Sequence, residues 1–236
     1  MEPIRIVYKD DAMLVCVKPR GVLSQAGGPG AESMVSLLSG QLGGEVFPVH
    51  RLDREVGGVM VYARTRDAAA MLSRMLQQGQ LQKEYLAVLS GIPPEPEGML
   101  EDLLFHDRSR NKTYVVDRKR KGVREARLKY RCLSTLGETA LVQVLLLTGR
   151  THQIRAQFAD VGHPLAGDGK YGREDVNRTY HESGQALYSW RLIFRFPTDA
   201  EHLNYLRGRQ FSVERKNIDF CQRYFPENRS EEHTSE

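Results

Sequence analysis

The chain has 236 residues, of which 40% are hydrophobic and 27% are charged. This balance is typical of a globular protein and excludes a disordered or collagen-like chain. No run approaches the roughly 20 apolar residues that a membrane-spanning helix requires, and the first residues lack the apolar core of a signal peptide. We therefore expect a cytoplasmic protein that does not associate with a membrane.

The net charge of +4 is unevenly distributed along the chain. Between Asp107 and Arg131 there are eleven Lys and Arg but three acidic residues, a local net charge of +8. A concentrated basic stretch favours a polyanionic partner such as a nucleic acid, although many such stretches are only solvated surface. The three cysteines, Cys16, Cys132 and Cys221, are far apart and form no CxxC pair, so we expect reduced thiols.

Apolar periodicity and turn residues predict the secondary structure. In chain order, strands are expected as a pair within residues 4–18 and then at 46–49, 58–63, 85–89, 139–147 and 186–196. Helices are expected at residues 32–42, 65–78, 151–161 and 218–224. Residues 111–131 are expected to form a basic hairpin. Because strands outnumber helices and do not alternate strictly with them, the pattern indicates an α+β fold with a mixed or antiparallel central sheet and flanking helices.

The third predicted helix begins close to several candidate functional residues. We expect Thr151 to cap this helix and Ile154, Phe158 and Val161 to share its buried stripe. We also expect one domain over residues 1–228, followed by a polar tail at 229–236, RSEEHTSE. The tail is either an ordinary disordered terminus or non-native, because it matches one reading frame of a common sequencing adapter. The codons of the source gene distinguish these two interpretations.

Several familiar motifs are incomplete in this sequence. The Gly-Lys pair within residues 162–172 is not followed by the Ser or Thr of a phosphate-binding loop. The HRLD at residues 50–53 lacks the downstream Asn and DFG of a kinase. The histidines do not have the spacing of metal ligands. We therefore expect no metal site.

Three blocks of polar residues remain, each beside apolar strand material, where a rigid scaffold presents chemistry. They are VHRLDREVGG at 49–58, KEYLAV at 83–88 and LTGRTHQIR at 147–155, the last continuing to GHPLAGDGKYG at 162–172. Asp53 lies between two arginines that favour its ionised form, and an ionised carboxylate can act as a nucleophile or base. Tyr85 can offer a flat ring to a planar ligand. The simpler alternatives are a turn aspartate in a surface ion pair, a core tyrosine and, for Arg155, a charge on a helix surface.

In order and content, these blocks resemble the RluA-type family of pseudouridine synthases. The family patterns HRLDxxTSG, KxYxA, TGRxHQIR and GHPxxGDxxYG correspond here to HRLDREVGG, KEYLA, TGRTHQIR and GHPLAGDGKYG. The resemblance implies isomerisation of a uridine in structured RNA to pseudouridine, in which the N1–C1′ bond breaks and C5 bonds to C1′. No cofactor or metal is implied. Ribosomal RNA is the favoured substrate and tRNA the alternative, and we expect a monomer.

Carried over by position, the resemblance implies a role for each matching residue. Asp53 would be the nucleophile, Tyr85 would stack on the flipped uracil, and Arg155 would pair with Asp53 and hold it ionised. Ile154 would line the uracil pocket, and Arg51 would stabilise the space that the flipped base leaves. Further RNA contacts are expected from five residues: His50, Arg150, Lys119, Arg120 and Lys121.

Two departures from the family pattern affect these expectations. Val56 and Gly57 stand where the family has Thr and Ser, whose hydroxyls would support the turn of Asp53, although Gly57 can adopt an unusual φ. The small N-terminal RNA-binding domain of some relatives is not expected here, so the basic stretch at 108–131 would bind RNA. The main alternative is a non-catalytic RNA-binding protein with the same fold. A glycosidase is less favoured, because it needs two carboxylates and Glu55 is the only nearby candidate.

Overall fold

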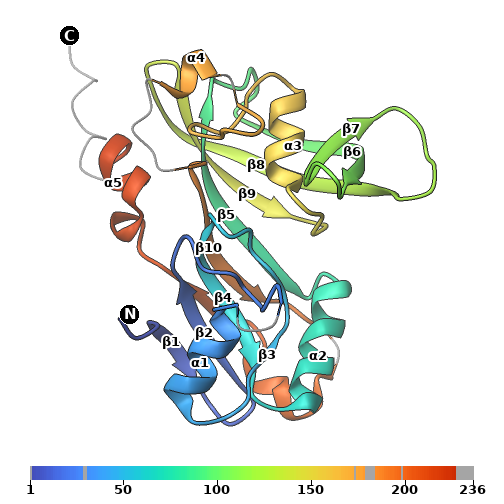
Figure 1. Cartoon of the computed structure of the whole chain (residues 1–236), viewed down its shortest axis with the longest axis vertical. Coiled ribbons are helices and arrows are strands. Elements are labelled where there is room, and N and C mark those ends of the chain that lie inside the picture. The colour runs from blue at the N-terminus through green and yellow to red at the C-terminus, as the bar shows by residue number, and fades with distance from the viewer. Residues whose placement is uncertain (1, 29–30, 173, 179–183, 198, 227–236) are drawn as a thin grey trace. The chain divides into compact units, whose positions relative to one another are not determined.

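The computed structural model describes residues 2–28, 31–172, 174–178, 184–197 and 199–226 (Figure 1). The polar tail expected at 229–236 lies outside these residues. The chain divides into two compact units, each built from two chain segments. Unit 1 comprises Met1–Glu84 and Ser189–Ser212, and unit 2 comprises Tyr85–Tyr188 and Val213–Glu236. Each unit therefore combines residues that are far apart in the sequence.

Unit 1 contains a sheet with the strand order β1-β2-β4-β10. These strands are β1 (Ile6–Lys9), β2 (Met13–Lys18), β4 (Gly57–Ala63) and β10 (Leu187–Phe194). The short strands β3 (Phe47–Pro48) and β11 (Gln210–Ser212) pair with β4 and β10. Every residue of β4 is buried, as its uninterrupted apolar sequence predicts. The expected turn between β1 and β2 is present, and Asp10 Oδ1 accepts hydrogen bonds from the amides of Ala12 and Met13, both at 2.8 Å.

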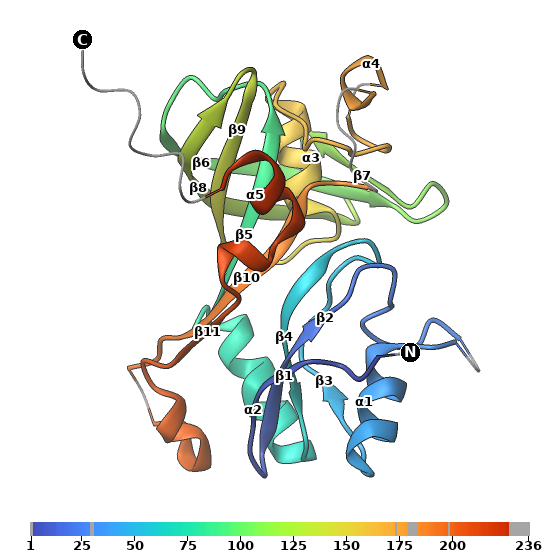
Figure 2. The ribbon, with the colours of Figure 1, turned by 90° about the vertical axis from the view of Figure 1, so that its left-hand side faces the viewer.

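The helices of unit 1 begin at side-chain caps. Helix α1 (Met34–Leu42) begins after Ser33, which forms a capping box with Ser36. Helix α2 (Arg66–Gln77) is capped by Thr65 and packs against β3 and β4 (Figure 2). Its buried residues are those that the amphipathic pattern predicts: Ala68, Met71, Leu72 and Met75. A 3₁₀ helix, η1 (Glu201–Leu206), precedes β11.

Unit 2 contains a sheet with the strand order β5-β9-β8-β6-β7. These strands are β5 (Leu81–Ser90), β6 (Glu97–Asp107), β7 (Lys112–Val116), β8 (Val123–Leu136) and β9 (Thr139–Leu146). Helix α3 (Gln153–Asp160) packs against β6 and β7 (Figure 1). Under this helix, Ala156 meets Leu104 of β6 and Ala126 of β8 in a small apolar cluster. The remaining helices are α4 (Glu174–Asn177), η2 (Arg215–Asn217) and α5 (Asp219–Tyr224).

The α+β class is confirmed, but three local predictions are wrong. The basic residues do not form one hairpin, because β6 lies between β7 and β8 and pairs antiparallel with both. Helix α3 begins after His152 rather than after a Thr151 cap. It ends at Asp160, so Val161 lies beyond the buried stripe and is exposed. The described residues include no helix long and apolar enough to cross a membrane.

Candidate active site

In unit 1, Asp53 lies half-buried in a tight turn that leads into β4. The amide of Val56 donates to the Asp53 carbonyl over 3.0 Å and closes the turn. The buried Lys18 Nζ donates to the carbonyl of Arg54 over 2.9 Å, and the amide of Gly21 donates to the same oxygen, also over 2.9 Å. The residue after Asp53 is therefore fixed by two donors, one at the end of β2 and one in the segment that follows it.

Burial lowers the pKa of Lys18 to about 8, although the negative charges of Glu55 and Asp53 act in the opposite direction. No role was predicted for Lys18. The signal for it in the sequence is the Lys-Pro-Arg-Gly run at residues 18–21, where a lysine ends an apolar strand.

The other side of the turn is held by a serine rather than by the hydroxyls that the family pattern has at residues 56 and 57. Ser24 Oγ accepts from the amide of Leu52 and donates to the Leu52 carbonyl, both at 2.9 Å. Tyr62 donates its hydroxyl to the Ser24 carbonyl over 2.8 Å. Val56 itself is buried and has no hydroxyl to offer. Support for the Asp53 turn thus comes from the chain segment around residues 18–24.

Of the two glycines that follow the Asp53 turn, Gly58 is the one for which a positive φ is observed, although the sequence suggested that Gly57 can adopt one. Gly58 has φ 127°, and a Cβ atom at this position would lie 2.2 Å from the carbonyl oxygen of Ser189. Only glycine combines this φ with so close an approach of two strands. The second glycine after the Asp53 turn is therefore required for β4 to lie beside β10.

His50 precedes the Asp53 turn and is 6% exposed. Its Nε2 accepts a hydrogen bond from the amide of Val61 over 3.3 Å. Burial lowers the pKa of His50 to about 3, and the nearby charge of Lys83 acts in the same direction. His50 is therefore a neutral imidazole that holds the start of the turn against β4. The RNA contact expected of His50 stays a prediction, as does that of Arg51, which is exposed.

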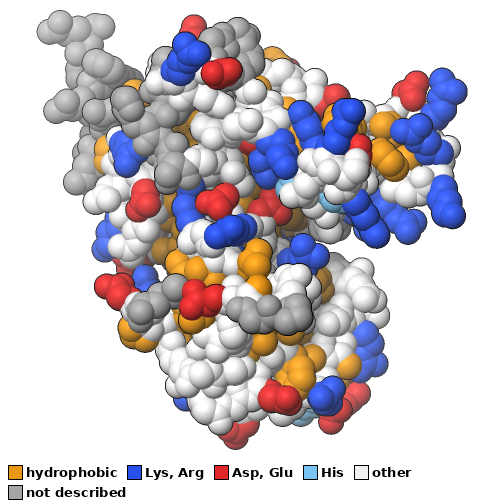
Figure 3. All heavy atoms as spheres, in the orientation of Figure 1, with side chains coloured by type: hydrophobic (Ala, Val, Ile, Leu, Met, Phe, Trp, Pro, Cys, Tyr) orange, Lys and Arg blue, Asp and Glu red, His pale blue; other side chains and the backbone are white. Residues whose placement is uncertain are grey.

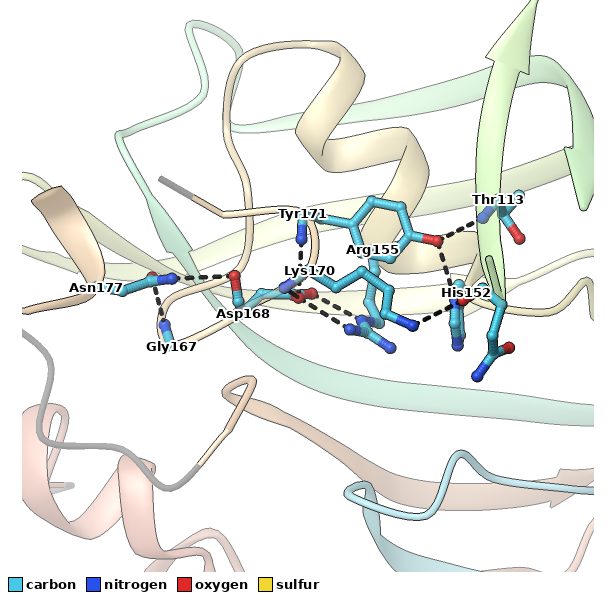
Figure 4. Close-up of polar contacts among 9 residues, drawn as sticks. Thr113, His152, Arg155, Gly167, Asp168, Lys170, Tyr171 and Asn177 are labelled. Carbon is cyan, nitrogen blue, oxygen red and sulfur yellow. Dashed lines mark hydrogen bonds and ion pairs between the residues drawn. The ribbon is translucent and has the colours of Figure 1, made fainter. Parts of the chain in front are cut away.

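In unit 2, Arg155 is buried on the first turn of α3 and forms a bidentate ion pair with Asp168 (Figure 4). Its Nε donates to Asp168 Oδ2 over 2.7 Å, and its Nη2 donates to Oδ1 over 2.9 Å. The Arg155 and Asp168 side chains are 8% and 0% exposed. A planar guanidinium bound at two points has a fixed orientation. Ile154, beside it on α3, is also buried.

The backbone around Asp168 completes its hydrogen bonding. Oδ1 also accepts from the amides of Lys170 and Tyr171, at 2.9 and 3.1 Å. The side chain of Asn177 donates to the Asp168 carbonyl over 3.0 Å and accepts from the amide of Gly167 over 3.1 Å (Figure 4). Burial raises the pKa of Asp168, but the hydrogen bonds and charge of Arg155 and these two amides outweigh it, so the pKa lies below its ordinary value. Asp168 is therefore an ionised, immobile partner for Arg155.

Tyr171 connects this ion pair to the start of α3. The Arg155 guanidinium carbon lies 4.9 Å from the centre of the Tyr171 ring. The Tyr171 hydroxyl accepts from the amide of Thr113 over 2.7 Å and lies 2.9 Å from His152 Nδ1 (Figure 4). His152, directly before α3, has φ 53°, a left-handed conformation that is rare for residues other than glycine. The contact with Tyr171 holds this conformation and, with it, the turn that carries Arg155.

The expected RNA-binding residues of unit 2 lie on its surface and several are engaged. Lys119 forms an ion pair with Glu125 at 2.6 Å, and Arg150 Nε donates to the Glu125 carbonyl over 2.9 Å. The Arg120 guanidinium lies 5.0 Å from the centre of the Phe105 ring. Lys121 is exposed. The charge of the basic stretch is thus compensated in part by acidic residues of its own strands.

The three predicted catalytic residues are divided between the two units. Asp53 is in unit 1, whereas Tyr85, buried on β5, and Arg155 are in unit 2. The predicted pairing of Asp53 with Arg155 therefore stays a prediction. Sequence reasoning missed Asp168 and Tyr171, although both stand in the GHPLAGDGKYG block that it singled out. Within the described ranges, no group of three or more His, Cys, Asp or Glu residues could hold a metal ion.

Comparison with known proteins gives consistent matches. Residues 12–160 match the family model described as RNA pseudouridylate synthase. Ribosomal large subunit pseudouridine synthase D of Nitrosomonas europaea is 32% identical over 213 residues, which cover 85% of this chain and 60% of that protein. The protein of the same name from Zymomonas mobilis is 31% identical over 228 residues, covering 92% of this chain and 68% of that protein.

Two further relatives extend the comparison. The mitochondrial tRNA pseudouridine(32) synthase of Saccharomyces cerevisiae is 33% identical over 189 residues, covering 78% of this chain and 40% of that protein. This chain thus spans 60% and 40% of the lengths of the Nitrosomonas and yeast relatives. The structure of human RNA Pseudouridylate Synthase Domain Containing 1 has a TM-score of 0.72 at 22% identity, covering 91% of this chain and 86% of that one, and shows a shared fold.

Proposed function

Because this chain belongs to the RNA pseudouridylate synthase family, in its RluA-type branch, we propose that it isomerises uridine to pseudouridine in a structured RNA. The observation that carries the proposal is the family match over residues 12–160, which includes Asp53, Tyr85 and Arg155. During the reaction C5 loses one proton and N1 gains one, so the isomerisation is balanced without an oxidant or a cofactor.

In this proposal Asp53 is the nucleophile that starts cleavage of the N1–C1′ bond, either by attack at C1′ or by driving formation of a glycal. Its turn is held in place by hydrogen bonds from Lys18 and Gly21 to the carbonyl of the next residue, Arg54, which gives the carboxylate a defined position. The released uracil then turns so that C5 faces C1′. A base within a helix must leave its stack before such chemistry, so the target uridine is flipped out.

The residues of unit 2 would bind the flipped nucleotide. Tyr85 would stack on the uracil ring, and Ile154 would provide an apolar wall. Arg155 would pair with the Asp53 carboxylate. Asp168 accepts hydrogen bonds from both Nε and Nη2 of Arg155 and thereby fixes the plane of the guanidinium. The fixed orientation of Arg155 supports this role, because a pre-oriented donor needs no rearrangement during the reaction.

For the RNA substrate, we propose ribosomal RNA first and tRNA second. The named relatives of large-subunit type favour ribosomal RNA, and the mitochondrial tRNA pseudouridine(32) synthase favours tRNA. RNA recognition of this kind uses loops with splayed bases. Separate incubation of unmodified large-subunit rRNA and unmodified tRNA with the protein distinguishes the two, since the substrate class gains pseudouridine and the other does not.

The proposed activity is tested by digestion of the treated RNA to nucleosides followed by chromatography. An isomerase leaves pseudouridine, a glycosidase leaves an abasic site and free uracil, and a non-catalytic RNA-binding protein leaves the RNA unchanged. Asp53→Asn serves as the matched control, because it replaces the carboxylate by an amide of the same size. We expect pseudouridine with the wild type and none with Asp53→Asn. Unchanged RNA of both classes, with RNA binding intact, would contradict the proposal.

A further inference from the structure

Two lysines of unit 2 are held close to Tyr171, next to the buried ion pair of Arg155. Lys112 is the first residue of β7, and its Nζ lies 5.2 Å from the centre of the Tyr171 ring. Lys170 immediately precedes Tyr171, and its Nζ donates to the carbonyl of Asn111 over 2.8 Å. Each lysine therefore contacts the chain neighbour of the other, so residues 111–112 and 170–171 lie side by side (Figure 4 labels Lys170 and Tyr171).

These two charges are not compensated within the part of the chain that the structure describes. Neither Lys112 nor Lys170 forms an ion pair there, whereas Lys119 pairs with Glu125 at 2.6 Å and Arg110 lies 3.9 Å from Asp107. Two like charges held near one another repel, and an anion bound to both removes that repulsion. Figure 3 shows further Lys and Arg side chains gathered on this side of unit 2.

Both lysines are also restrained before any ligand arrives. Lys112 Nζ lies between two aromatic rings, 5.2 Å from the centre of Tyr171 and 5.8 Å from that of Tyr114. Lys170 is fixed by its bond to Asn111 and by its amide, which donates to Asp168. Side chains that are already ordered lose less conformational entropy on binding than freely rotating lysines. Order and uncompensated charge together distinguish this pair from the other lysines of the basic stretch.

The position of the pair indicates which anion it binds. The guanidinium of Arg155 lies 4.9 Å from the same Tyr171 ring that Lys112 contacts. If Arg155 acts at the reacting nucleotide, as the proposed function holds, an anion beside Tyr171 belongs to the RNA backbone close to that nucleotide. We propose that Lys112 and Lys170 form a binding site for a backbone phosphodiester of the RNA substrate next to the flipped uridine.

The test measures RNA binding by the Asp53→Asn protein, in which turnover does not interfere. Affinity for an oligonucleotide with the target uridine is measured against salt concentration for Lys112→Met, Lys170→Met and the double variant in this background. Each lost contact with single-stranded RNA lowers the slope of log affinity against log salt by about 0.7 in magnitude. Lys112→Arg and Lys170→Arg keep the charge and are expected to restore the slope. Lys9→Met, an exposed lysine of unit 1, is the control and is expected to leave it unchanged.

Neutral methylphosphonate linkages, introduced one at a time around the uridine, then locate the phosphate. One linkage is expected to weaken binding to the Asp53→Asn protein and to have no further effect on the double variant. Unchanged salt slopes, or equal responses of both proteins to every linkage, would overturn the site. This outcome is distinct from failure of the proposed function, because product analysis tests the isomerase and the binding series tests only the two lysines.

Discussion

Replacement of Asp168 by Ala is expected to destabilise unit 2 strongly. Asp168 is fully buried and accepts two hydrogen bonds from Arg155 and two from backbone amides. Without its carboxylate, the buried guanidinium has lost its bidentate counter-charge and two amides have lost their acceptor. Removal of one partner of a buried ion pair typically costs about 3–5 kcal/mol. We therefore expect the free energy of unfolding to fall by an amount in this range. The larger values apply if the two backbone amides also remain without an acceptor.

The assay is urea denaturation followed by circular dichroism, with wild type and variant measured side by side. With a slope of about 2 kcal/mol per molar urea, the expected loss lowers the midpoint by about 1.5–2.5 M. The double variant Arg155→Met/Asp168→Leu is the control, because apolar residues of similar size leave no buried charge. We expect it to be more stable than Asp168→Ala. A loss below about 1 kcal/mol for Asp168→Ala, or a double variant less stable than the single one, would refute the reasoning.

The ion pair of Arg155 and Asp168 is expected to make the stability of the protein depend on pH. The pKa of Asp168 is raised by burial but lowered more by Arg155 and the two amides, so its folded pKa lies below the unfolded value of about 3.9. The unfolded chain therefore binds the proton more readily, and stability falls as the pH decreases towards the folded pKa. We expect Asp168→Asn, which cannot titrate, to show a shallower loss of stability between pH 5 and pH 2. An acid dependence as steep as that of the wild type would contradict this assignment.

Two further predictions concern single positions. Gly58→Ala is expected to lower the melting temperature, because the added Cβ would lie 2.2 Å from the Ser189 carbonyl oxygen and the backbone has φ 127°. The control Gly44→Ala is expected to have little effect, because no atom lies within 4 Å of its Cβ position. Equal melting temperatures for the two variants would contradict the close approach. Tyr171→Phe removes the acceptor of the Thr113 amide, a hydrogen bond of 2.7 Å in the wild type. We expect the free energy of unfolding to fall by about 1–3 kcal/mol and hydrogen exchange at this amide to become faster. Unchanged exchange would show that the Tyr171 hydroxyl is dispensable.

Most elements could be predicted from the sequence because their apolar periodicity is strong. The buried stripe of α2 and the uninterrupted β4 are the clearest cases. Strand β6 was missed because its sequence, EGMLEDLLFHD, gives no clean alternation of apolar and polar residues. Without β6, the two basic segments were expected to pair with each other, although β6 separates them. Pairing order depends on the whole sheet and is not encoded in either segment alone.

In the candidate active site, too, the sequence indicated single residues but not the partners that the fold brings to them. Asp53 and Arg155 were identified from their blocks, but the partner of Arg155 that the structure describes, Asp168, lies thirteen residues further along the chain and is reached only through the fold. The start of α3 was also misplaced. Local preference favours a Thr cap, whereas the contact of Tyr171 with His152 stabilises a left-handed residue instead. Tertiary contacts therefore decided the details that local sequence statistics could not.

The central claim is that this chain isomerises uridine with Asp53 as the nucleophile, and tritium release tests it most directly. RNA labelled with tritium at uridine C5 is incubated with wild type and with Asp53→Asn of matched melting temperature. C5 loses its hydrogen when it forms the bond to C1′. The account therefore predicts that the wild type releases tritium to water and that Asp53→Asn does not. Release by neither protein from rRNA or tRNA, or equal release by both, would contradict it.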